Sequence, residues 1–299
     1  MITEVTAENQ ERARGFLEQH LDTSLFLLGN LASLGPRRDA SLNSGNFRMI
    51  EEDGRVVAVF CLSRRGNLLL QSGGRAEFAR AIVEACDNEP IPIEAVVGEW
   101  SLAEAAFRIL KEERGLKPTY YSKEILYGQA LVASAPAFAG PESGLLVRRL
   151  EPSDFEAWER LNRQYLIEAG FPVQGSLEQR RAGFESSALA EHWWGAFDGG
   201  ELVSTAGLNA RYADVGQVGG VFTLPSRRNQ GLARDVMRGL ARDALDRHHL
   251  SQLLLFTGED NVAARRMYER LGYEQRGYFA LLFGEARVAD AGRSASPTS

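Results

Sequence analysis

The sequence predicts a fold of the α/β (α+β) class, built from two similar halves. Short alternating or apolar runs, typical of strands, are interspersed with amphipathic stretches typical of helices. The same order of hairpin, strand, helix, strand, helix and closing strand occurs twice. Between the two series, residues 133–144 are rich in Ala, Ser, Pro and Gly, which is typical of a linker. We therefore expect a duplicated fold.

Composition agrees with two domains of ordinary size. The chain has 299 residues, of which 44% are hydrophobic and 25% are charged. Its net charge of −6 does not favour general binding to nucleic acid or to an anionic membrane, because both need a basic surface. No apolar run approaches the roughly 18 residues of a membrane span, and the first residues lack the apolar core of a signal peptide. We expect a cytoplasmic protein without nucleic-acid or membrane partners.

The two cysteines, Cys61 and Cys86, each lie in an apolar stretch. This setting favours buried free thiols. Two cysteines make neither a disulfide framework nor a zinc site, so we expect no metal.

Turn and cap residues mark the elements of the first half. Thr6 is a candidate helix cap, Asp53-Gly54 is a hairpin signal, and Gly35-Pro36 and Gly115 are helix ends. The expected helices are residues 7–20, 24–34, 75–86 and 102–114. The expected strands are residues 47–52, 55–63, 68–71, 93–97 and 123–132, the last of which would close this half.

The second half follows the same scheme. Glu151-Pro152 and Ser153 open a helix, Gly199-Gly200 form a hairpin turn, and Gly272 ends the last helix. The expected strands are residues 145–150, 193–198, 201–208, 215–223, 252–257 and 273–283. The expected helices are residues 153–169, 177–189, 230–247 and 261–271. We predict a first domain at 1–133, a second at 145–285 and a flexible tail at 286–299.

The turn after the strand 215–223 combines the features of an anion-binding site. Pro225 ends the strand, and a helix begins within a few residues. The first N–H groups of a helix lack internal partners and carry the positive end of its dipole, so a diphosphate can lie on them. Gly231 and Ala233 keep side chains out of the way. Positive charge comes from three arginines: Arg227, Arg228 and Arg234. Alone, this pattern also fits a turn with solvated arginines. The chain has neither a P-loop nor a Gly-x-Gly-x-x-Gly fingerprint.

A second element begins 28 residues after Ala233. Asn261 stands at a helix start, and Tyr268, seven residues later, shares its face of the helix. Two structural roles also explain these residues, because Asn caps helices and Tyr packs in amphipathic cores.

Together these stretches resemble the GCN5-related N-acetyltransferase (GNAT) family over about residues 145–283. The segment Arg228-Asn229-Gln230-Gly231-Leu232-Ala233 resembles the family's Arg/Gln-x-x-Gly-x-Gly/Ala acetyl-CoA motif, and Val221 to Pro225 resembles the strand before it. Asn261 to Tyr273 resembles the Asn-x-x-Ala-x-x-x-Tyr-x-x-x-Gly-Phe/Tyr element. The two halves also resemble bacterial GNAT proteins with a degenerate N-terminal acetyltransferase-like domain.

The resemblance implies a mixed, mostly antiparallel sheet flanked by helices in two tandem GNAT-like domains. It also implies transfer of an acetyl group from acetyl-CoA to a primary amine of a small molecule or peptide in a ternary complex. A non-catalytic acyl-CoA-binding or regulatory module, or transfer of another acyl group, remains an alternative.

The implied site residues divide by role. The backbone of the strand would pair with the pantetheine arm, the turn would hold the pyrophosphate, Asn261 would contact the cofactor arm, and Tyr268 would protonate the departing thiolate. The strand residues are Val221, Phe222 and Thr223, and the turn residues are Arg228, Asn229, Gln230, Gly231, Leu232, Ala233 and Arg234.

The base that deprotonates the amine stays open. Glu259, Asp260 and His192 are candidates, although structural roles, as helix-start acids and as an ordinary surface or core histidine, explain them better.

The first half departs from the family pattern. Its corresponding turn, residues 71–76, has glycines without the Arg-x-x-Gly-x-Ala spacing. Its later helix has Ser101 and Arg108 where the second half has Asn and Tyr. We expect no second cofactor site there.

Overall fold

The computed structural model describes residues 1–132, 142–171, 173 and 175–286. The expected linker (residues 133–144) and tail (residues 286–299) therefore lie largely outside the described residues. Contacts divide the chain into two compact units. The first unit comprises Met1–Leu17, Leu34–Ser122 and the residues from Ala280 on, and the second comprises Glu18–Ser33 and Lys123–Phe279. The predicted domain boundaries describe the repeats along the sequence and stay a prediction.

In the first unit the strand order is β1-β2-β3-β4-β5-β12. The strands are β1 (Ile2–Glu4), β2 (Gly45–Glu52), β3 (Arg55–Ser63), β4 (Asn67–Gln71), β5 (Ala95–Glu99) and β12 (Glu274–Glu285), and the helices are α1 (Gln10–Gln19), α3 (Ala79–Cys86) and α4 (Trp100–Glu113). All pairs among β1 to β4 are antiparallel, and β4 pairs with β5 in parallel. Asp53 and Gly54, both at positive φ, form the predicted hairpin turn between β2 and β3.

In the second unit the strand order is β6-β11-β10-β9-β8-β7. The strands are β6 (Lys117–Ala130), β7 (Leu146–Arg149), β8 (Trp193–Asp198), β9 (Glu201–Tyr212), β10 (Val215–Thr223) and β11 (Gln252–Gly258). The helices are α2 (Leu21–Leu34), α5 (Phe155–Ala169), α6 (Leu177–Leu189), α7 (Leu232–Asp246) and α8 (Val262–Arg270). Only β10 and β11 pair in parallel; the other pairs that we describe are antiparallel. This confirms the predicted mixed, mostly antiparallel sheet flanked by helices.

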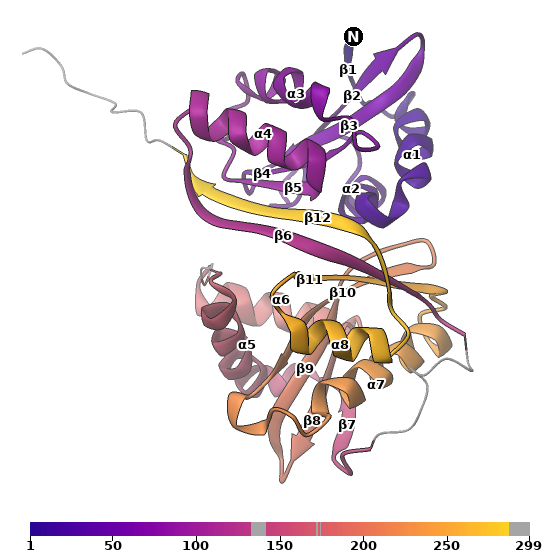
Figure 1. Ribbon diagram of the computed structural model, residues 1–299, viewed down its shortest axis with the longest axis vertical. Helices are drawn as coiled ribbons and strands as arrows, with labels where there is room; N and C mark the ends of the chain where they lie inside the picture. The colour runs from indigo at the N-terminus through magenta and orange to yellow at the C-terminus, as the bar shows by residue number, and fades with distance from the viewer. Residues whose placement is uncertain (133–141, 172, 174, 287–299) are drawn as a thin grey trace, which may run out of the picture. The chain divides into compact units, whose positions relative to one another are not determined.

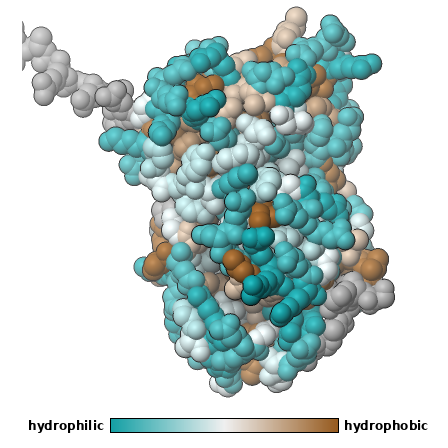
Figure 2. Space-filling view, in the orientation of Figure 1, coloured by the Kyte–Doolittle hydropathy of each residue, from teal (hydrophilic) through white to brown (hydrophobic). Residues whose placement is uncertain are grey.

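Helices cover both faces of the second unit's sheet (Figure 1). Trp194 of β8 packs in a core cluster with α7 and α8, whereas its neighbour Trp193 packs with α5 and α6. Because successive strand residues point to opposite faces, this pair identifies the two layers. The face shown in Figure 2 is largely hydrophilic, with hydrophobic residues in isolated patches.

Two predicted strands differ from the structure in their partners. Residues 123–132 were expected to close the first half, but β6 pairs with β11 from Glu124↔Gly258 to Ala130↔Gln252, within the second unit. The expected last strand of the second half, β12, continues into the first unit next to β5. Apolar periodicity predicts a strand but carries no information about its neighbour, so the exchange has no local signal.

Within the described residues, no helix has the length and apolar character to cross a membrane.

Candidate functional site

The parallel strands β10 and β11 separate at their C-terminal ends. Their pairing runs from Val215↔Gln252 to Val218↔Leu255. Beyond this point β10 continues along β9 as far as Thr223, and β11 continues along β6 as far as Gly258. Each strand thus keeps its outer neighbour and leaves its inner edge available. The inner edges offer main-chain hydrogen bonds to an extended ligand between them.

A bulge in β10 lies at this opening. Gly219 pairs with Gly207, but the next pair is Phe222 with Thr205, so β10 carries an extra residue. Gly220, at φ +60°, turns the strand, and a Cβ there would lie 2.7 Å from the Trp193 ring. The bulge increases the local bend and places Val221 at the opening.

Two carbonyl groups of β10 are fixed by the neighbouring strand. Thr205 Oγ1 donates to the Gly220 oxygen at 3.1 Å, and Ser204 Oγ donates to the Phe222 oxygen at 3.0 Å. The Phe222 side chain is buried, with its ring centroid 5.9 Å from that of Tyr165 in α5. These contacts hold the strand on the outer side and leave its inner edge toward the opening.

The turn after β10 forms a cradle of N–H groups. Asn229 and Gly231 both have positive φ, 62° and 77°, and α7 begins at Leu232 with Gly231 as its N-cap. Helix 230–247 was thus predicted two residues early, because left-handed backbone precedes the first helical turn. The described residues offer no acceptor to the N–H groups of residues 229–234. The first N–H groups of α7 therefore face outward at the positive end of its dipole.

The backbone conformation at Gly231 favours glycine. A Cβ there would lie 2.9 Å from Arg234 Nη2, and the positive φ disfavours any other residue. The absent side chain keeps the backbone accessible to an anion.

The arginines of the turn are held by carboxylates. Arg228 binds Glu168 at 2.6 Å and donates to the Thr223 carbonyl at 3.3 Å. Arg234 binds Glu142 at 2.6 Å. These pairs are partly exposed and individually weak, so a phosphate can replace either carboxylate.

Asn261 and Tyr268 both have structural roles. The Asn261 side chain is exposed and caps α8 by accepting from the Ala264 N–H at 3.3 Å. Tyr268 is only 5% exposed, and its ring centroid lies 6.3 Å from that of Tyr127 and 5.8 Å from that of Tyr273. Burial raises the pKa of Tyr268, so its hydroxyl keeps its proton at neutral pH.

Two residues that the sequence did not single out lie near Tyr268. Tyr165 of α5 and Glu124 of β6 both raise the pKa of Tyr268 further through their charge. Glu124 is buried and lies opposite Gly258. An acid directly before the apolar run from Ile125 to Tyr127 was the available signal, but sequence order assigned that strand to the other half.

The candidate bases named from the sequence occupy two different places. Glu259 and Asp260 are exposed after the end of β11. His192 stacks edge-on against His248 with centroids 6.2 Å apart, and burial lowers its pKa to about 4. His248 follows the C-terminal end of α7, a helix ~22 Å long, whereas the turn precedes its N-terminal end. The structure thus places His192 near the far end of α7, whereas Glu259 and Asp260 follow the end of β11 that borders the opening.

The corresponding strands of the first unit stay together. β4 and β5 pair through Leu70↔Gly98, one residue before each strand ends. Arg75 in the following turn binds Glu52 and Glu77. This unit therefore lacks the separated edges seen between β10 and β11.

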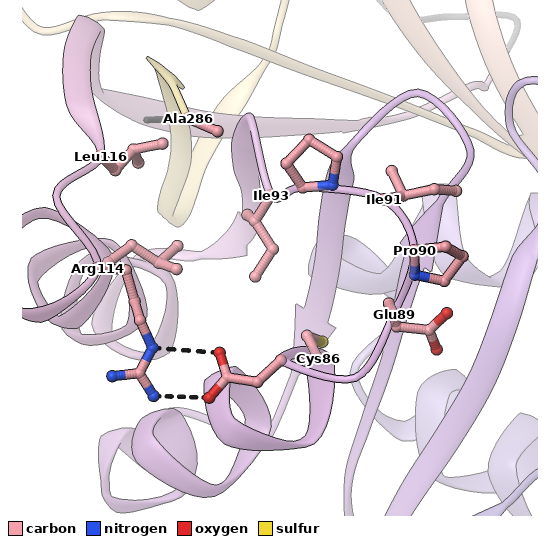
Figure 3. A pocket seen from close by; sticks show the side chains of 11 residues that line it. Cys86, Glu89, Pro90, Ile91, Ile93, Arg114, Leu116 and Ala286 are labelled. Carbon is pink, nitrogen blue, oxygen red and sulfur yellow. Dashed lines mark hydrogen bonds and ion pairs between the residues drawn. The ribbon is translucent and has the colours of Figure 1, made fainter. Parts of the chain in front are cut away.

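The first unit contains a cavity of about 320 Å³ (Figure 3). Its walls combine apolar side chains with those of Asp87, Glu89 and Arg114, and Arg114 forms a two-point ion pair with Asp87 at its edge. It contains none of the predicted site residues.

Comparison with known proteins agrees with this geometry. The profile of the Acetyltransferase (GNAT) family matches residues 149–273. A search of curated proteins finds no significant match. In the described part of the chain, no group of three or more His, Cys, Asp or Glu side chains is placed to hold a metal ion.

Solved structures of low identity share the fold along most of the chain. A GCN5-related N-acetyltransferase from Sphaerobacter thermophilus is 16% identical, with a TM-score of 0.60, covering 94% of both chains. One from Kribbella flavida is 19% identical, with a TM-score of 0.56, covering 89% of this chain and 95% of that one. A tandem GNAT protein from the clavulanic acid biosynthesis pathway is 14% identical, with a TM-score of 0.53, covering 96% and 98%. Residues 149–273 thus match the acetyltransferase (GNAT) family, and the chain shares its fold with a tandem GNAT protein.

Proposed function

We propose that the chain is an N-acetyltransferase that transfers an acetyl group from acetyl-CoA to a primary amine by direct attack. The observation that carries the proposal is the separation of β10 and β11 beside the N–H cradle of residues 229–234. An extended thioester arm fits between the strands, and a diphosphate fits the start of α7. The acceptor is an amine of a small molecule or a peptide.

The residues present fit acetyl-CoA. The backbone of Val221 to Thr223 would pair with the pantetheine arm as an added strand. The cradle would bind the pyrophosphate, with Arg228 and Arg234 moving from their carboxylates to phosphate oxygens. Asn261, at the start of α8, would contact the arm.

Tyr268 has the protonation state that the reaction needs. A protonated phenol donates its hydrogen to the thiolate as the carbon–sulfur bond breaks and the carbon–nitrogen bond forms. Both cysteines are buried in the first unit, and burial raises the pKa of Cys86 to about 12. No acyl-cysteine intermediate is part of this proposal.

A non-catalytic acyl-CoA-binding module is the second candidate. Packing between Tyr127 and Tyr273 accounts for Tyr268 without catalysis, which favours this candidate. Transfer of a longer acyl group is a variant of the main proposal. A panel of amines and acyl-CoA donors with free-thiol detection separates the three.

The proposed pyrophosphate site at residues 229–234 predicts that Gly231→Glu weakens CoA binding. A carboxylate at this position would block the N–H groups and repel the diphosphate, so CoA binding should weaken by at least ~2 kcal/mol, about 30-fold. Isothermal titration calorimetry measures this change, and wild type should bind one CoA per chain.

Gly74→Glu is the matched control. Gly74 also has a positive φ, 88°, and lies in the corresponding turn of the first unit. It should leave CoA affinity unchanged. Equal CoA affinities of wild type and Gly231→Glu, with the fold intact, would exclude the proposed pyrophosphate site at residues 229–234. Binding of two CoA molecules per chain would show that the first unit also binds CoA.

A further inference from the structure

The cavity of the first unit lies where two helices end. α3 ends at Cys86 and α4 at Glu113, and residues that follow each helix line the cavity (Figure 3). Its volume of about 320 Å³ falls within the range of small-molecule sites, which begins at about 300 Å³. The described residues that line it include none of those proposed for acetyl-CoA binding. The proposed acetyltransferase site therefore does not account for this cavity.

The apolar walls of the cavity belong to the first unit's core. The side chains of Cys86, Leu110 and Leu116 are buried in one core cluster, and Ile93 and Ala286 pack against that cluster. All five line the cavity. An apolar group that enters the cavity leaves water for apolar surroundings, which favours its binding.

One wall of the cavity is the connection between α3 and β5, which is fixed at both ends. At its start, the buried Glu89 carboxylate binds Arg38 at 2.6 Å and also binds Arg48. At its end, the Glu94 N–H donates to the Gly66 carbonyl at 2.8 Å. Two prolines between these ends restrict the backbone further. A ligand therefore meets a wall that is already ordered, which lowers the entropic cost of binding.

The edge of the cavity carries one positive and one negative charge. Arg114 donates to both carboxylate oxygens of Asp87, from Nε at 3.1 Å and from Nη2 at 2.7 Å. The Arg114 side chain is 36% exposed and that of Asp87 is 46% exposed, so this pair is weak and can separate. Among the described residues, Glu89 is the other charged side chain at the cavity, and its two arginines compensate its charge.

This pair of charges favours a ligand that carries both signs. A carboxylic acid on Arg114 would leave the Asp87 carboxylate without its partner, and an amine on Asp87 would leave Arg114 without its own. A zwitterion between the two satisfies both, because its carboxylate accepts from the planar guanidinium and its ammonium donates to Asp87.

We propose that this cavity binds the zwitterion of an apolar α-amino acid of about the size of leucine. The two charged groups would lie between Arg114 and Asp87, and the side chain would lie against Ile93, Leu110 and Leu116. The cavity has the volume of about ten water molecules at roughly 30 Å³ each, which is enough for a branched apolar amino acid. The proposal concerns the first unit and does not rest on the proposed acetyltransferase function.

Isothermal titration calorimetry of the full chain with L-leucine tests the proposal. One leucine should bind per chain, at least about tenfold more tightly than glycine, which has no side chain to bury. Two analogues of leucine each lack one charge: 4-methylpentanoate has no ammonium, and isoamylamine has no carboxylate. Each should bind at least about tenfold more weakly than leucine, because one charged residue at the edge loses its partner.

Three variants test the residues that the proposal names. Arg114→Gln and Asp87→Asn each remove one charge and should weaken leucine binding at least about tenfold. Ile93→Trp keeps both charges but fills the cavity, and should abolish binding. The matched control is Arg80→Gln. Arg80 forms a similar two-point pair with Glu113, at 2.6 and 2.9 Å, and does not line the cavity, so leucine affinity should not change.

Three results would overturn the proposal. The first is no leucine binding up to about 10 mM. The second is binding of either single-charge analogue as tightly as leucine, which would show that only one charge of the pair is used. The third is binding by a chain that ends at Ala286 but not by the full chain, which would show that residues 287–299 are the occupant of the cavity.

Discussion

Tyr268→Phe is expected to lower kcat by about 100-fold while CoA affinity stays near wild type. The change removes one hydroxyl and keeps the ring that packs between Tyr127 and Tyr273. Loss of a general acid affects the chemical step and leaves ground-state binding in place. Steady-state kinetics of thiol release measures kcat, and calorimetry measures CoA binding.

Tyr273→Phe is the matched control for this result. Tyr273 is the adjacent buried tyrosine, and its hydroxyl has no hydrogen-bond partner among the described residues. Its loss should leave turnover unchanged and not reduce stability. If Tyr268→Phe turns over at the wild-type rate, Tyr268 has no part in the mechanism, and the acetyltransferase proposal rests on cofactor binding alone.

Deletion of residues 1–139 is expected to abolish cooperative folding of the remaining chain. The deletion removes β6, which pairs with all seven residues of β11. It also removes three side chains of the second unit's core, those of Ile125, Tyr127 and Leu131. Loss of one such side chain costs roughly 2–5 kcal/mol, and the sum approaches the whole stability of a typical domain, about 5–15 kcal/mol. Circular dichroism and thermal denaturation measure the outcome.

Cutting the chain without removing a piece provides the control. A protease site inserted between residues 133 and 141 separates the same segments, but β6 stays available to β11. The cut protein should elute as one species in gel filtration and unfold near the temperature of the intact chain. A folded fragment of residues 140–299 with normal CoA binding would show that β6 is dispensable.

Local signals predicted much of the second unit. Gly199 and Gly200, both at positive φ, form the hairpin turn that their sequence indicated, and Ser176 caps helix α6, which spans the predicted residues 177–189. These features depend on a few neighbouring residues, so the sequence contains their cause. The start of α7 was displaced because Asn229 was not recognised as a left-handed residue.

Partners across long sequence distances could not be predicted in this way. The exchange of β6 and β12 depends on which edges meet in three dimensions, and an apolar strand fits many edges. For the same reason Glu124 was read as part of the first half. It comes close to Tyr268, 144 residues later in the chain, only through its pairing with Gly258. The position of Glu124 could therefore not be inferred until the strand partners were known.

The most direct test of the acetyltransferase proposal is amine-dependent thiol release from acetyl-CoA by the full chain. We predict that at least one primary amine in a panel of polyamines, amino acids, aminoglycosides and lysine peptides releases CoA thiol and gains an acetyl group by mass spectrometry. The release should be strongly reduced by Gly231→Glu. Binding of one CoA per chain with no thiol release from acetyl-CoA or longer acyl-CoA donors, whatever the amine, would contradict the proposal and identify a binding module.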